Sequence, residues 1–138
     1  MSEENIEIMR RLVEEFQAGM ERGDPGGFFD AGLFAADSEW VTPQFEGRRV
    51  WRGREGFVEF MRTWTEDFED WSIRVERLID AGGDRVVALT HHSATGRASG
   101  VPVEGNYGVI YELKNGRITR TTLYGSHTAT LKAAGLSE

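Results

Sequence analysis

The chain has 138 residues, a formal net charge of −7 and no cysteine. This length fits a single domain spanning residues 1–138, which can bury enough surface to be stable without cross-links. The acidic balance argues against nucleic acid as a partner, because proteins that bind nucleic acids need a basic face to displace counterions from phosphates. The absence of cysteine excludes disulfide bonds, thiolate catalysis and cysteine-ligated metals.

The apolar runs are only a few residues long, so we expect no membrane span. The N-terminal segment 1–11 is rich in charged residues and lacks the hydrophobic region of a signal peptide. We therefore expect a cytoplasmic protein that has no membrane partner.

The first half of the chain shows the periodicity of amphipathic helices. Residues 5–22 form the first predicted helix, and Asp24-Pro25 begins a second, short helix that ends near Ala36. A third helix is predicted from Gly53 to about Phe68. The apolar stripes of these helices contain Ile6, Met9, Leu12, Val13, Phe16 and Met20; Phe28, Phe29, Leu33 and Phe34; and Phe57, Phe60, Met61, Trp64 and Phe68.

A cluster of arginines lies just before the third helix. Arg48, Arg49, Arg52 and Arg54 surround Trp51. This cluster is compatible with an anion-binding patch or with a solvated turn, and the acidic residues elsewhere favour the turn.

The second half of the chain alternates between apolar and polar residues, which indicates strands. A brief strand is expected at 38–42, before the third helix, and longer antiparallel strands follow from Trp71 to a turn at 80–84, then at 85–95, 101–113 and up to Tyr124. Asn115-Gly116 separates the last two and is a strong hairpin signal, since both positions require a positive φ. A last short helix is expected at 128–134, ended by Gly135.

This order of elements predicts an α+β fold, in which a curved, cone-shaped antiparallel sheet wraps around three N-terminal helices. A gap between the helices and the sheet would form an internal apolar pocket. The outer face of the sheet would need a second partner, and homodimerisation is a common solution, although the Arg and Thr residues on the strands leave it open. The residues predicted to line the pocket are Phe16, Trp40, Met61, Trp64, Tyr107, Val109 and Tyr124.

Four stretches carry a resemblance to a known family: WRGREGFVEFM at 51–61, LIDAGGDRVVAL at 78–89, TGRASGVPVEGNYGVIYELKNGRI at 95–118 and LKAAGL at 131–136. With the layout of the elements, they resemble a bacterial SnoaL-like protein of the nuclear transport factor two-like superfamily. The resemblance implies a cone-shaped α+β barrel with an internal pocket, which is often dimeric. It implies no single activity, because related folds include ketosteroid isomerase, polyketide cyclases, epoxide hydrolases and non-enzymatic binders.

The residues that the family uses for catalysis are replaced here. The isomerase has a carboxylate base just before a proline, where this chain has Thr42, and a tyrosine on the first helix, where this chain offers Phe16. Neither replacement can perform the proton transfer. Close relatives often have a histidine at the position of Val109 and acidic residues near Leu123 and Ser126, so these departures also argue against cyclase-type acid–base chemistry.

Two histidines and two tyrosines are candidate catalytic groups. His91 and His92 are adjacent in a predicted strand, so only one of them can face the pocket, and the pattern does not decide which. The inward histidine is compatible with a general base or with a hydrogen-bonded structural residue. Tyr107 and Tyr124 could each donate a hydroxyl to a ligand or serve as core residues.

No His-x-His pair or carboxylate cluster accompanies His91, His92 or His127, so we expect no metal and no cofactor. The first functional hypothesis is a domain that binds a hydrophobic small molecule, with cofactor-independent isomerase, cyclase or hydrolase activity as its enzymatic form. The second is a non-catalytic binding or assembly module whose interior is filled by its own aromatic residues. A cavity of ~300 Å³ or more would favour the first hypothesis.

Overall fold

The computed structural model describes residues 2–22, 29–43 and 50–136. Within these ranges it contains the helices α1 (Ser2–Glu21), α2 (Gly53–Asp67) and α3 (His127–Ala133) and a 3₁₀ turn at Phe29–Ala31. The strands are β1 (Phe34–Val41), β2 (Val50–Arg52), β3 (Phe68–Gly82), β4 (Arg85–Gly96), β5 (Pro102–Lys114) and β6 (Arg117–Tyr124). None of the helices in the described ranges is long and apolar enough to cross a membrane.

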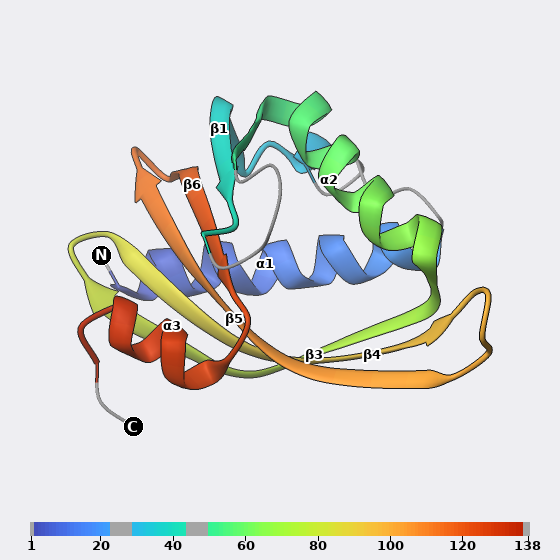
Figure 1. Cartoon of the computed structure of the whole chain (residues 1–138). Coiled ribbons are helices and arrows are strands. Elements are labelled where there is room, and N and C mark those ends of the chain that lie inside the picture. Colours follow the sequence, from blue (N-terminus) through green and yellow to red (C-terminus); the bar gives the residue numbers. More distant parts are fainter. Residues whose placement is uncertain (1, 23–28, 44–49, 137–138) are drawn as a thin grey trace.

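The strands form one curved, open sheet in the order β2-β1-β6-β5-β4-β3 (Figure 1). All neighbours are antiparallel except β1 and β6, which run parallel. The sheet is therefore mixed rather than purely antiparallel, and the predicted α+β fold is confirmed.

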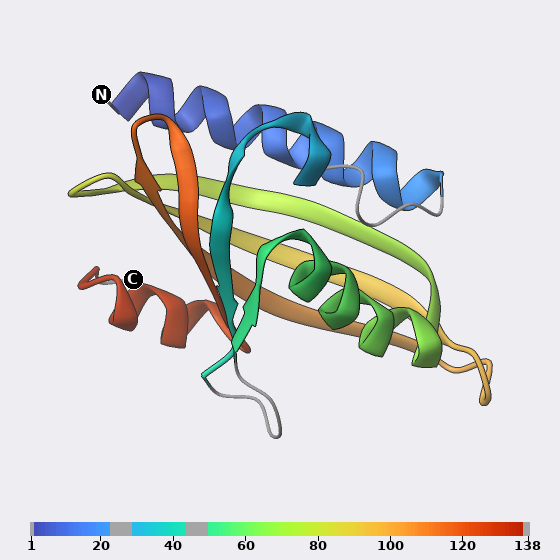
Figure 2. The same cartoon turned by 90° about the horizontal axis from the view of Figure 1, so that it is seen from above.

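The helices cover both faces of the sheet (Figures 1 and 2). Helices α1 and α2 lie on one face, where Met9, Leu12, Phe57 and Phe60 join Val109 and other inward side chains in the main core. Helix α3 lies on the opposite face, and a second core forms there from Val87, Leu89, Ile110, Leu131 and Ala134. Because successive strand residues point to opposite faces, one strand supplies residues to both cores.

The predicted hairpin between β5 and β6 is confirmed. Asn115 and Gly116 have φ values of 53° and 75°, as a two-residue type I′ turn requires. The β3–β4 hairpin uses the same device, because Gly83 and Asp84 have φ values of 60° and 58°. This turn is shorter than the one predicted at 80–84, because β3 continues to Gly82 and β4 begins at Arg85.

The predicted second helix is wrong over the residues that the structure describes. Residues 24–28 lie outside the described ranges, but Phe29–Ala31 forms only a 3₁₀ turn and β1 already begins at Phe34. Gly32, with a φ of 83°, follows the turn, and the carbonyl of Leu33 accepts a hydrogen bond of 2.9 Å from the amide of Ile118. Pairing with β6 thus overrides the local helical spacing. In the described ranges, the N-terminal part of the chain contributes the two α-helices α1 and α2 and the 3₁₀ turn, where three helices were predicted.

The arginine-rich segment contains a strand that the sequence did not predict. Strand β2 ends at Arg52, whose Nε lies 3.1 Å from Oε2 of Glu39 on β1. Arg48 and Arg49 lie outside the described residues. In the described part of this segment, Arg52 therefore forms an intramolecular ion pair that joins the neighbouring strands β2 and β1.

Candidate functional site

A cavity of about 90 Å³ lies between α1, α2 and the inner face of the sheet. Helix α1 contributes residues one turn apart, α2 contributes its aromatic stripe, and the strands contribute alternate residues. The lining consists of Leu12, Val13, Phe16, Gln17, Trp40, Phe60, Met61, Trp64, Trp71, Ile73, Val75, Ala88, Thr90, His92, Val109, Tyr111 and Leu123. Among the described residues, no Asp, Glu, Lys or Arg lines it.

A second, outer hollow of about 230 Å³ adjoins the cavity and shares Phe16, Gln17, Trp71 and Ile73 with it. Glu21 lines only the outer hollow. Nε2 of Gln17 donates a hydrogen bond of 2.8 Å to the carbonyl of Ile73, which ties α1 to β3 at the shared wall. The outer hollow therefore lies next to the cavity along this shared wall.

Aromatic rings form a continuous arc along the cavity wall. The ring centroids of Trp40 and Phe60 are 5.4 Å apart, and those of Phe60 and Trp64 are 6.0 Å apart. The arc continues from Trp64 to Trp71 at 5.4 Å and from Trp71 to His92 at 6.0 Å. Neighbouring rings are tilted or nearly perpendicular, which is the arrangement that aromatic quadrupoles favour.

Five of the seven residues predicted to line the pocket lie on the cavity wall: Phe16, Trp40, Met61, Trp64 and Val109. Tyr107 is inward but lies beside the wall, with its ring 4.6 Å from His92 and 5.7 Å from Trp64. Tyr124 lies elsewhere, because it packs against the outer core under α3. Its pairing partner on β5 is Gly108, which also lies on the outer face.

Sequence reasoning missed Trp71 and Tyr111 as lining residues. Both could have been found from strand alternation, because residues two apart share a face. Trp71 is on the same face as Ile73 and Val75, and Tyr111 is on the same face as Val109.

His92 is the inward histidine, and we assign its tautomer from its contact with Thr90. The hydroxyl of Thr90 donates to the carbonyl of Tyr107 at 3.1 Å, so its oxygen accepts from Nε2–H of His92 at 2.9 Å. Nδ1 of His92 then carries no proton, and it is buried without a partner. Burial, followed by the nearby charge of His91, lowers the pKa of His92 from 6.5 to about 4. The imidazole is therefore neutral at neutral pH.

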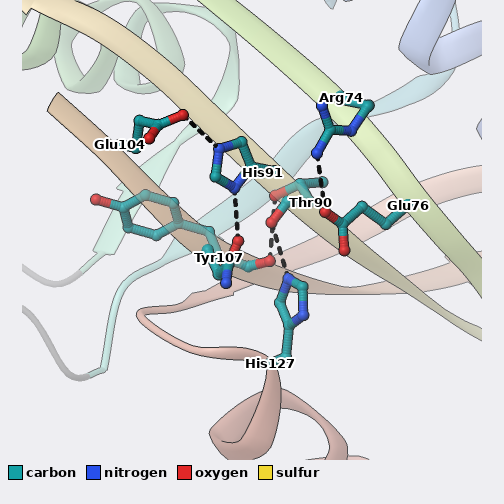
Figure 3. A network of polar contacts seen from close by, with 8 residues as sticks. Arg74, Glu76, Thr90, His91, Glu104, Tyr107 and His127 are labelled. Carbon is teal, nitrogen blue, oxygen red and sulfur yellow. Dashed lines mark hydrogen bonds and ion pairs between the residues drawn. The ribbon is translucent and has the colours of Figure 1, made fainter. Parts of the chain in front are cut away.

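His91 precedes His92 in β4, so it points to the opposite face of the strand, and it has the opposite electrostatics. Figure 3 shows its contact with Glu104. Its Nδ1 lies 2.7 Å from Oδ1 of Asn106, and its Nε2 lies 3.1 Å from Oε1 of Glu104. These hydrogen bonds, with that to Asn106 first, raise the pKa of His91 above 6.5. His91 is therefore a surface group that cannot reach a ligand in the cavity.

His127 has a structural contact. Its Nε2 lies 2.8 Å from the carbonyl oxygen of Thr90, so it donates there and joins the start of α3 to β4 (Figure 3). In the ranges that the structure describes, no group of three His, Cys, Asp or Glu side chains is placed to hold a metal ion. Thr42 is fully buried and does not line the cavity.

Solved structures with this fold match nearly the whole chain. A protein from Catenulispora acidiphila DSM 44928 with a ketosteroid isomerase-like fold, in complex with trimethylamine, has a TM-score of 0.69 and 19% identity, over 91% of this chain and 93% of that one. A nuclear transport factor two-like protein of unknown function from Burkholderia pseudomallei K96243 has a TM-score of 0.74 and 16% identity, over 94% and 95%. TerC, co-crystallised with polyporic acid, has a TM-score of 0.70 and 20% identity, over 96% and 98%.

At these identities the similarity shows the fold alone. Among curated proteins, none matches the chain. The model of the SnoaL-like domain matches residues 13–121, which is most of the chain. The chain therefore belongs to the SnoaL-like domain family.

Proposed function

We propose that this SnoaL-like domain binds a small hydrophobic molecule in the cavity between α1, α2 and the sheet. The observation that carries the proposal is the wall itself, which is apolar and aromatic apart from Gln17, Thr90, His92, the hydroxyl of Tyr111 and the indole N–H groups. Ligand sites typically combine such walls with a few polar groups. The neighbours in complex with trimethylamine and co-crystallised with polyporic acid support a small-molecule role for this fold.

The size of the cavity restricts the ligand. Its volume of about 90 Å³ is smaller than that of typical drug-sized sites, ~300 Å³ or more. An engineered apolar cavity of ~150 Å³ holds one benzene molecule. The cavity is smaller than that, so the ligand is compact, and a ligand of about one ring would extend partly into the outer hollow.

The cavity favours binding over acid–base catalysis. A general base works best with a pKa near the operating pH, whereas the pKa of His92 is lowered to about 4. Burial raises the pKa of Tyr107, and burial together with Glu112 raises that of Tyr124, so neither is a ready proton donor. An isomerase, cyclase or hydrolase using these groups is therefore the less favoured form of the proposal.

The small volume also favours a second candidate, a non-catalytic assembly module with a filled core. In that case the aromatic arc would serve packing alone. The sequence also predicts a homodimer and a cytoplasmic location. Both are compatible with either candidate function and remain predictions.

Thermal unfolding with a panel of compact hydrophobic molecules separates the candidates. A ligand at ~100 times its dissociation constant adds ~2.7 kcal/mol, which should raise the midpoint by more than ~5 °C. We expect at least one such shift in the wild type, and its loss in Val109→Trp, which fills the cavity.

Val103→Trp is the matched control, because Val103 lies on the same strand but is 39% exposed. It should keep the shift. A panel that produces no shift in a folded wild-type protein would leave the filled-core module as the better description.

A further inference from the structure

Three residues that line the cavity each have a buried polar atom that makes no hydrogen bond: Nε1 of Trp40, Nε1 of Trp71 and Nδ1 of His92. Burying an unsatisfied polar group is costly, so native proteins contain few of them. In the part of the chain that the structure describes, the other such side chains are Thr42 and Thr121, which do not line the cavity. Unsatisfied hydrogen-bonding capacity is thus concentrated at the candidate site.

Two of these atoms are complementary and belong to neighbouring rings. The indole N–H of Trp71 can only donate, and Nδ1 of His92 can only accept, because Thr90 holds the proton of the imidazole on Nε2. The ring centroids lie 6.0 Å apart and the ring planes are nearly perpendicular, at 82°. A hydroxyl group accepts and donates at a single oxygen, so it can satisfy both atoms at once.

The charge of the wall disfavours anionic ligands. The described part of the wall carries no Arg or Lys to neutralise an anion and no Asp or Glu to neutralise a cation. The titratable groups near His92 lie on the opposite face of the sheet. His91 points to that face, and Glu104 and Arg74 lie beside it there. Transfer of an unpaired ion into such a wall is strongly unfavourable.

We propose, on the basis of the binding function above, that the ligand is a compact neutral alcohol or phenol whose hydroxyl lies between Trp71 and His92. The hydroxyl donates to Nδ1 of His92 and accepts from Nε1–H of Trp71. Its hydrocarbon body packs against the aromatic arc and Val109. Both atoms have less than 1 Å² of exposed surface, so the two rings must turn slightly for the hydroxyl to reach them.

The test compares phenol with toluene, which has nearly the same shape but a methyl group in place of the hydroxyl. Binding is measured by tryptophan fluorescence titration, since three of the four tryptophans line the cavity. In the wild type, phenol should bind at least tenfold more tightly than toluene, and benzoate should bind least. His92→Phe and Trp71→Phe should each reduce the affinity for phenol about tenfold and leave that for toluene nearly unchanged.

His91→Gln is the matched control on the outer face and should leave both affinities unchanged. ¹⁵N NMR of the imidazole supplies a second measurement, independent of any variant that fails to fold, and phenol should shift the His92 Nδ1 signal where toluene does not. Equal affinities for phenol and toluene would overturn this inference but leave the proposed function intact. Absence of binding by both, and by the wider hydrophobic panel, would overturn the proposed function as well.

Discussion

His91 and His92 show how one step along a strand changes the chemistry of a side chain. His92 is enclosed by the rings of Trp71 and Tyr107, so burial lowers its pKa to about 4. His91 meets Asn106 and Glu104 at the surface, so its pKa is raised. The two residues therefore differ in charge under mildly acidic conditions.

This difference predicts a pH-dependent stability. Between pH 6.5 and about 4 the unfolded chain protonates His92 but the folded chain does not, so the free energy of unfolding falls as the pH falls. The loss reaches about 3 kcal/mol near pH 4 and levels off below it. His91 acts in the opposite direction, because its stabilisation is present at low pH and is lost as the pH rises through its raised pKa.

Urea unfolding of the wild type and His92→Gln from pH 7 to pH 4.5 isolates this contribution, since the carboxylates titrate equally in both. The wild type should lose more stability than the variant. Parallel profiles would show that His92 is not buried as a neutral group.

Helix α3 is the element most dependent on its surroundings. It has seven residues, too few for a helix to be stable in isolation. The Ser126 side chain accepts a hydrogen bond from the amide of Ala129 at 3.1 Å, and the amide of Leu136 donates to Leu131 at 2.8 Å past Gly135. These caps satisfy its termini, and packing on the outer face of the sheet supplies the rest.

Gly108 controls how closely α3 approaches the sheet. A Cβ atom at this position would lie 2.5 Å from Cβ of Thr130. Gly108→Ala should therefore destabilise the protein by about 2 kcal/mol, as overpacking does. Thermal unfolding should show a lower midpoint, with partial recovery in Gly108→Ala/Thr130→Gly. Asn106→Ala, on the same face of β5 but exposed, is the control, and an equal loss in that variant would contradict the steric explanation.

Elements with strong local signals could be predicted from the sequence. The helical stripes of α1 and α2 and the Asn115-Gly116 turn depend on neighbouring residues alone. The start of strand β1 could not be placed: the strand predicted at 38–42 overlaps its second half, but its first residues have helical spacing and become a strand only by pairing with β6, which is remote in sequence. The three-residue β2 is too short to show a pattern.

The candidate site was predictable only in part, for a related reason. Whether His91 or His92 faces inward depends on the phase of β4, and the placement of Tyr124 depends on its pairing with Gly108. Both are set by strand register, which local alternation does not determine.

At the scale of the whole molecule, the curvature of the sheet creates both the cavity and the division between the two cores. Helices α1 and α2 fill the inner face without closing it completely, and α3 covers apolar residues on the outer face (Figure 2). The function that we propose depends on the inner space being open and apolar, whatever the identity of the ligand.

Xenon tests this requirement most directly, because it binds in apolar cavities without any hydrogen bond. A crystal structure under xenon pressure should show a xenon atom bounded by Phe16, Trp64 and Val109. The Val109→Trp variant should lose that atom. A pressurised wild-type crystal with no xenon at this position would contradict the proposal and show that the interior is packed core.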